Sequence, residues 1–278
     1  MTPSTASVGT VPSRRASRSV LATASLTVLW TLLIYRLPII PASGVPTTAR
    51  QLAVHALVAA GLWIGLERAD LTPNQRRTTW LAVVIPYTLW FAVAWSASIN
   101  GVFRVDASPS SVPLLPLAIF VPVLIGAPML LSSTRIGRAL DATPTSWLVA
   151  VQLYRVLGSW ALAAWLRGQM PGAFALPAGI GDVLTGVLAL PTAIAVATGT
   201  AEGRKAAILW NVFGLADFAV AVTMGMITSA GPLQLIFPKV PSIGAGAYPD
   251  VLTPAFVVPS SILLHVLSLR QLVRRSGE

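Results

Sequence analysis

Three ionisable residues lie inside apolar segments of membrane-spanning length: Arg155, Asp182 and Asp217. At a helical rise of 1.5 Å per residue, each lies roughly 14–17 Å from the start of its segment, near the midplane of a ~30 Å hydrocarbon core. Charges at that depth are costly and usually face a protein interior or a water-filled cavity. Short connections make consecutive segments neighbours, so Arg155 is expected to pair with one of the two aspartates.

The charges in this set do not balance. One arginine neutralises one aspartate, so the second carboxyl must be protonated, bind a cation or contact water. One hypothesis is that this carboxyl exchanges a proton, a sodium ion or a cationic substrate, while the other aspartate pairs with Arg155. The alternative is a structural lock between helices. Gln152 lies on the same helix face as Arg155 and is expected to bond to a carboxylate or to the guanidinium.

Helix-breaking residues directly precede the first aspartate. Pro177, Gly179 and Gly181 come before Asp182 in the stretch FALPAGIGDVLTG. Proline removes a backbone donor and glycine weakens a helix, so the pattern predicts an interrupted helix with free backbone groups that bind an ion or substrate. Alternatively, Gly179, Asp182 and Gly186 form a stripe of closely spaced positions that lets another helix approach.

The remaining polar residues give little sign of a cofactor. His55 and His265 lie at different predicted depths, so a shared metal or haem is not expected, and His265 is expected to hydrogen-bond Ser261 one turn before it. The chain has no cysteine and therefore no thiolate metal site. No phosphate-binding loop, GxSxG or HExxH motif occurs, so neither a cofactor nor a metal is expected.

An enzyme is the less favoured class. The predicted cytoplasmic loops, at about 6–14 residues, are too short to hold a soluble catalytic domain. An intramembrane enzyme acting on lipid is the third hypothesis, and its one supporting residue is Asn211, predicted near the inner membrane surface. Asn211 precedes Asp217 by six residues, about 120° around the helix, and is expected on a different stripe.

Composition identifies the elements that must position these residues. Hydrophobic residues make up 55% of the 278 residues and charged residues only 10%, whereas soluble domains contain about 25% charged residues. The net charge of +10 arises from basic residues in short loops between apolar runs, which is typical of membrane proteins and argues against nucleic-acid binding. The expected fold is all-α, a polytopic transmembrane helical bundle.

Eight spans of about 20 residues are expected, with seven or nine as alternatives. The fourth contains Pro113, Pro116, Pro122 and Pro128 and is expected to be kinked or partly unwound. Residues 1–18 are expected to form a disordered cytoplasmic tail, with a cleaved signal peptide as the alternative, and 273–278 a second tail. The domain between them, 19–272, has predicted spans at 19–37, 51–66, 78–99, 112–132, 146–166, 173–198, 206–228 and 251–270.

The distribution of basic residues predicts the orientation. With the N-terminus inside, each cytoplasmic segment carries at least two Lys or Arg, as the positive-inside rule requires. The basic residues on the other side are Arg36, Arg50, Arg104, Arg167 and Lys239. Both termini are therefore expected in the cytoplasm. The external segment 229–250 is expected to be either a re-entrant flap or a loop lying on the bilayer.

A resemblance covers the half of the chain that holds the charges. The run Gln152-Leu153-Tyr154-Arg155 followed by FALPAGIGD resembles a family of bacterial multi-pass membrane proteins with no assigned function, over roughly residues 146–272. The resemblance implies an integral protein of the bacterial cytoplasmic (inner) membrane and implies nothing about a substrate.

The sequence thus predicts a cation- or proton-coupled transporter or channel for a small solute, with a midplane site. The alternative is a membrane scaffold or sensor whose charges are structural. The expected partners are the lipid bilayer and a small solute, proton or sodium ion, without nucleic acid. The predicted site residues are Arg155, Asp182, Asp217, Gln152, Gly179 and Gly181.

Overall fold

A computed structural model describes residues 21–29, 45–104, 113–240 and 246–274. Its regular structure is helical, and seven helices are long and apolar enough to cross a membrane. The prediction of an all-α membrane fold is therefore confirmed. The first predicted span, 19–37, lies mostly outside the described residues. Its described part, residues 21–29, is helical, and the count of eight spans stays a prediction. The predicted tail 1–18 also lies outside them. Of the predicted tail 273–278, residues 273 and 274 belong to the last helix instead, and 275–278 lie outside the described residues.

Most of the helices follow one another with short connections, and the two long ones come after α3 and after α9. Residues 145–166 form one continuous span made of α6, η1 and α7, in which η1 is a 3₁₀ segment, and the last span opens with the π-helical turn η2. The elements are α2 (Val45–Arg68), α3 (Pro73–Ile99), α4 (Leu114–Ser132), α5 (Thr134–Ala142), α6 (Thr145–Ala150), η1 (Val151–Gly158), α7 (Ser159–Leu166), α8 (Gly172–Ala197), α9 (Ala201–Thr228), η2 (Thr253–Val257) and α11 (Val258–Arg274).

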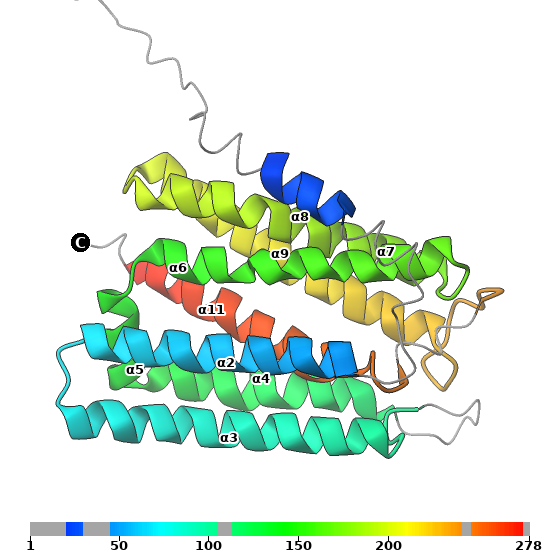
Figure 1. Ribbon diagram of the computed structural model, residues 1–278, viewed down its shortest axis with the longest axis horizontal. Helices are drawn as coiled ribbons and strands as arrows, with labels where there is room; N and C mark the ends of the chain where they lie inside the picture. Colours follow the sequence, from blue (N-terminus) through cyan, green and yellow to red (C-terminus); the bar gives the residue numbers. More distant parts are fainter. Residues whose placement is uncertain (1–20, 30–44, 105–112, 241–245, 275–278) are drawn as a thin grey trace, which may run out of the picture.

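The long helices lie side by side along one direction, and α11 crosses obliquely through the middle of the bundle (Figure 1). It contacts α4, α6 and α9, so its side chains are enclosed by other helices. The helix starts have ordinary causes. Thr72 and Gln75 form a capping box with Pro73 in the first turn of α3, and Thr200 caps α9 by accepting from the backbone N–H of Gly203.

Two expected interruptions are absent. Pro122 and Pro128 lie inside a continuous α4, so this span is not unwound, and the alternative of a kink stays a prediction. Pro177 lies inside a continuous α8, so the break predicted before Asp182 is wrong as well. In an apolar environment free backbone groups have no water to bind, so an unwound segment is costly. The loss of the single N–H donor at a proline is tolerated within a membrane helix. The irregular backbone lies in the neighbouring span instead, at η1.

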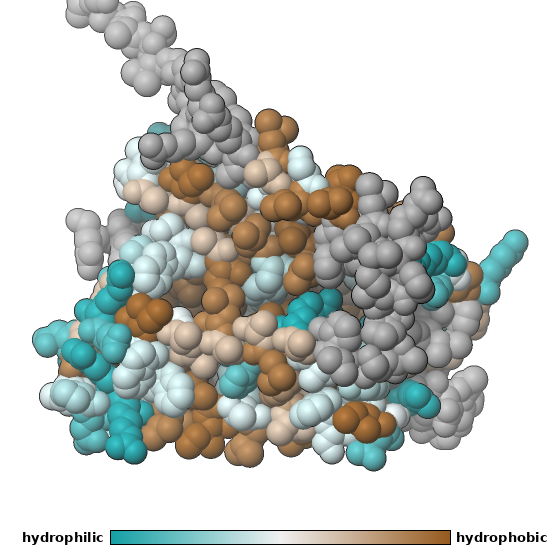
Figure 2. All heavy atoms as spheres, viewed as in Figure 1, coloured by the Kyte–Doolittle hydropathy of each residue, from teal (hydrophilic) through white to brown (hydrophobic). Residues whose placement is uncertain are grey.

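The connections alternate between two ends of the bundle. One end, which we call the basic end, holds Arg274 and four connections: 69–72, 133, 143–144 and 198–200. The connections 133 and 143–144 lie on either side of α5. Figure 2 shows hydrophilic side chains gathered there, on the left, beside a broad apolar belt. Its basic residues are Arg68, Arg76, Arg77, Arg135, Arg138, Arg204, Lys205, Arg270 and Arg274.

The opposite end carries the long connection after α9. Within it, the backbone N–H groups of Leu235 and Ile236 both donate to the carbonyl of Ile227, which folds this segment back against α9. Leu235 and Phe237 remain 75% and 78% exposed. Residues 241–245 lie outside the described residues, so the choice between a re-entrant flap and a loop lying on the bilayer stays open.

Candidate functional site

Arg155 owes its position to the 3₁₀ segment η1, in the middle of the fifth predicted span. In a 3₁₀ helix, residues three apart eclipse one another, which aligns Gln152, Arg155 and Gly158 along one face. Gln152 and Arg155 are both buried. Eight residues is long for a 3₁₀ run, which rarely exceeds three or four. The unusual backbone therefore coincides with the buried charge.

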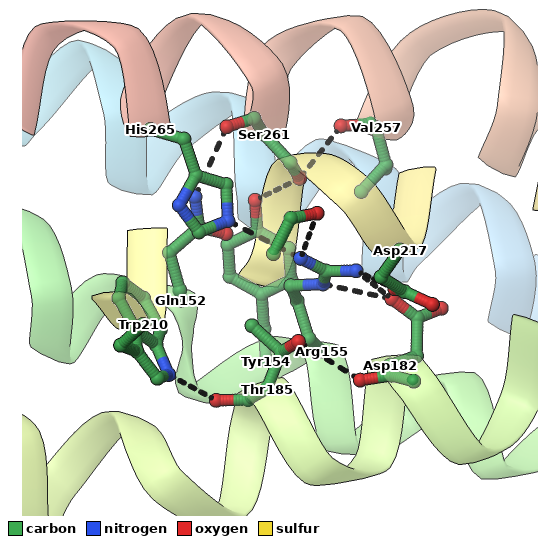
Figure 3. A network of polar contacts seen from close by, with 12 residues as sticks. Gln152, Tyr154, Arg155, Asp182, Thr185, Trp210, Asp217, Val257, Ser261 and His265 are labelled. Carbon is green, nitrogen blue, oxygen red and sulfur yellow. Dashed lines mark hydrogen bonds and ion pairs between the residues drawn. The ribbon is translucent and has the colours of Figure 1, made fainter. Parts of the chain in front are cut away.

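The guanidinium of Arg155 binds both aspartates (Figure 3). Its Nε donates to Oδ1 of Asp182 at 2.7 Å, and Nη2 lies 2.7 Å from the same oxygen. The same Nη2 donates to Oδ2 of Asp217. The expectation of a single pair is thus replaced by one arginine that bridges two carboxylates from two helices, α8 and α9.

The other side of the guanidinium is also occupied. Nη1 of Arg155 donates to the carbonyl of Gly214 at 3.3 Å and lies 3.2 Å from Nε2 of His265. The guanidinium carbon lies 3.8 Å from the centre of the Phe218 ring, a cation–π contact. All five N–H groups of Arg155 therefore face an acceptor, which is what a buried guanidinium requires.

His265 connects the charges to Asn211. Arginine only donates, so Nε2 of His265 must accept, and the imidazole proton is then on Nδ1, which donates to Oδ1 of Asn211 at 2.9 Å. Asn211 in turn donates to Oγ of Ser268 at 3.1 Å. The prediction that His265 bonds Ser261 is wrong, because the Ser261 hydroxyl bonds Tyr154 and its own helix.

Gln152 is buried beside the site but does not join the ion pairs. Its Nε2 donates to the carbonyl of Ser261 at 3.1 Å, so the predicted bond to a carboxylate or to the guanidinium is absent. The 3₁₀ rise of about 2 Å per residue places Gln152 about 6 Å along the axis from Arg155, opposite α11 instead of the aspartates. Within the described chain, its Oε1 is buried without a hydrogen-bond partner.

Three glycines make room for the charged side chains. A methyl group on Gly158 would overlap Asp182, and one on Gly181 would overlap Asp217. A methyl group on Gly214 would meet His265 at 2.5 Å. Each helix thus gives up a side chain where another helix inserts a polar one.

Gly179 and Gly186 have a packing role. A methyl group on Gly179 would lie 2.7 Å from Leu162, and one on Gly186 would lie 2.5 Å from the backbone nitrogen of Val156. Both glycines let α8 approach the span that carries Arg155, as the alternative interpretation of this stretch predicted. Because α8 is continuous, Gly179 and Gly181 do not supply the free backbone groups that an interrupted helix would.

A search of protein families matches residues 112–273, which is more than half of the chain, to a domain of unknown function, DUF8737. The chain belongs to this family. No curated protein and no solved structure matches it. The family match confirms the resemblance seen in the second half and extends it to α4 and α5. It includes every residue that contacts Arg155 and excludes α2 and α3.

The two carboxylates differ in access. The side chain of Asp217 is 5% exposed and that of Arg155 2%, whereas that of Asp182 is 28% exposed. A second arginine, Arg50 near the start of α2, also interacts electrostatically with Asp182. Asp182 is therefore the open side of the cluster, and Asp217 the closed side.

A polar stripe on α11 escaped the sequence-based prediction. Ser261, His265, Ser268 and Gln271 are each at most 1% exposed, and their spacing of four, three and three residues places them along one side of the helix. Gln271 donates to the backbone carbonyls of Leu140 and Thr143, which ties the stripe to the basic end. The spacing was visible in the sequence, and a count of polar residues at helical intervals within the span would have found it.

Proposed function

We propose that this protein is an integral membrane transporter or channel that exchanges a proton or a monovalent cation at Asp182. In this proposal Asp217 is the fixed counter-ion of Arg155, and the basic end faces the cytoplasm. The enrichment of Lys and Arg at that end supports the orientation, because basic residues are retained on the cytoplasmic side during insertion.

The observation that carries the proposal is the unequal access of two carboxylates on one guanidinium. Arg155 compensates one negative charge, and Asp217, packed against Gly181 and 5% exposed, is held in place for that role. Asp182 contacts the same guanidinium but remains 28% exposed, so its charge can be met from outside the cluster. Ionisable groups placed at this depth commonly lie on ion or proton pathways.

The hydrogen-bonded row beyond Arg155 holds the guanidinium in place. His265, Asn211 and Ser268 are linked to one another and run from the cluster toward the basic end. Arg155 stands between Asp182 and His265 and only donates hydrogen bonds, so this row does not carry a proton away from Asp182. In this proposal the exchange therefore takes place at Asp182 alone.

Ion flux into liposomes tests the proposal. The purified chain, reconstituted with a potassium diffusion potential, should carry protons reported by an internal dye, or take up sodium ions, above protein-free vesicles. Asp182→Asn should abolish the flux because the amide cannot exchange a proton or pair with a cation. Asp141→Asn is the matched control, since Asp141 is an exposed carboxylate at the basic end. Parent vesicles that carry neither ion would overturn the proposal.

The second candidate is a scaffold or sensor in which the cluster locks the helices together. The complete set of acceptors around Arg155 favours it, because a fully hydrogen-bonded guanidinium is also what a structural ion pair needs. This candidate predicts that Asp182→Asn lowers stability as much as Asp217→Asn does, without any ion flux in the parent.

A further inference from the structure

Arg50 is anchored at the end of the bundle away from the basic end. It lies in the second turn of α2, and its Nη2 donates to Oγ1 of Thr253 in η2 at 2.9 Å. The neighbouring Gln51 donates to the same oxygen at 3.1 Å and is fully buried. These bonds fix the guanidinium of Arg50 at the junction between α2, which lies outside the family match, and the first turn of the last span.

Arg50 lies within electrostatic range of two carboxylates. It interacts electrostatically with Asp250, which closes the turn before η2, and with Asp182 at the midplane. Within the described residues it forms no ion pair within 4.0 Å with either of them. A single positive charge is therefore shared between a carboxylate near the surface and the open carboxylate of the cluster.

Asp250 is held in a defined position. The two residues after it, Val251 and Leu252, are fully buried and anchor the turn. Burial raises the pKa of Asp250 to about 6, and the charge of Arg50 opposes this rise. The other charged or titratable groups beside this turn are Tyr248, which bonds Thr48 of α2, and Arg104 at the end of α3, next to Gly246.

The charges of the extended cluster depend on Asp250. Arg50 and Arg155 face three carboxylates, so one negative charge remains when all are ionised. That charge falls on Asp182 when Asp250 neutralises Arg50. When Asp250 is protonated, Asp182 is the remaining carboxylate that balances Arg50, and the cluster has no net charge to attract a cation.

We propose that Asp250 and Arg50 form an entry site for the cation at the end opposite the basic end, with Arg50 shared between Asp250 and Asp182. Ionised Asp250 balances the charge of Arg50, so Asp182 keeps the unbalanced negative charge that attracts the cation. When Asp250 is neutral, Asp182 balances Arg50 instead, and that attraction is lost. This inference rests on the proposed function of Asp182.

A double-mutant cycle on ion flux tests the entry site at one fixed external pH of 7.5. Asp250→Asn should reduce the flux of the reconstituted chain at least about tenfold, which is the effect of one pKa unit of charge interaction. In an Arg50→Gln background the same substitution should change the flux less than about twofold, because no charge of Arg50 is left for Asp182 to balance. Asp250→Glu should restore the parent flux.

The cycle separates the two proposals. Parent flux that Asp182→Asn abolishes, combined with equal effects of Asp250→Asn in both backgrounds, would overturn the entry site and leave the proposed function intact. Absence of parent flux would overturn both. Size-exclusion profiles establish that each variant is folded, and Asp250→Ser replaces Asp250→Asn if the amide variant aggregates. Thr253→Val, which removes the acceptor that holds Arg50, should alter flux in the parent and not in Arg50→Gln.

Discussion

The three spans α2, α3 and α4 differ from the four that follow in how much of each helix is covered. In an apolar stretch of 18 residues from each span, buried residues make up 28%, 22% and 11% in α2, α3 and α4, and 39%, 39%, 33% and 44% in the four later spans. In a membrane the uncovered residues face lipid, and the exposed Leu89 and Leu124 are of this kind.

The later spans also hold the charge cluster, and the family match begins just before α4. The comparison indicates that helix packing in the later spans is organised around Arg155, whereas the earlier spans form a shell on one side. Arg50, on α2 of this shell, interacts electrostatically with Asp182 of the cluster. Stability should therefore respond more strongly to substitutions in the later spans than to matched ones in the earlier spans.

Removing Arg155 should have the largest effect. Arg155→Gln leaves two buried carboxylates without their shared positive charge, and breaking a buried ion pair from one side costs about 3–5 kcal/mol of unfolding free energy. Arg77→Gln makes the same substitution at an exposed position of α3 and should change stability by less than about 0.5 kcal/mol. Thermal unfolding in detergent compares the two variants, and equal melting temperatures would remove the distinction between the regions.

Alanine in place of a glycine should act in opposite directions in the two regions. A methyl group on Gly181 overlaps the carboxylate of Asp217, and such overpacking costs about 1–3 kcal/mol. Gly61 in α2 has open space around it, and alanine there should stabilise the helix by up to about 1 kcal/mol. The melting temperatures of the two single variants should therefore lie on either side of the parent. A fall of similar size in both would contradict the packing difference.

Sequence reasoning found the spans and the residues of the charge cluster because both signals are local. Length and hydropathy define a span, and a charge inside it stands out against apolar neighbours. Sequence reasoning predicted a broken helix at Pro177 because it used the helix propensities of proline and glycine and left out the apolar environment. That environment keeps α8 continuous. It missed the bridge from Arg155 to two aspartates because the sequence carries no sign of the 3₁₀ segment or of which helix faces which glycine.

The two aspartates should differ in stability as they differ in exposure. Asp217→Asn weakens a charged hydrogen bond inside the closed side of the cluster and should lower the unfolding free energy by about 1.5–3 kcal/mol. Asp182→Asn changes the open side and should stay within about 1 kcal/mol of the parent, because functional groups are often held at the expense of stability. Chemical denaturation of each variant measures both effects, and the reverse order would assign the exchanging role to Asp217.

The smallest effect concerns Asp250, where the earlier spans meet the later ones. Burial raises the folded-state pKa of Asp250 to about 6, above its ordinary value of 3.8, so the folded chain binds this proton more tightly than the unfolded chain does. Stability from this group therefore falls as the pH rises from about 4 to about 6, and the loss is complete above that window.

Asp250→Asn removes the loss, so the variant should match the parent near pH 4 and exceed it by about 1 kcal/mol near pH 7, allowing for solvent screening of a half-buried group. Melting temperatures in detergent at a series of pH values measure this difference, with Asp70→Asn on the exposed loop after α2 as the control. A constant offset between Asp250→Asn and the parent across the series would mean that Asp250 does not change its protonation with folding, and that Arg50 is not shared in the way the entry site requires.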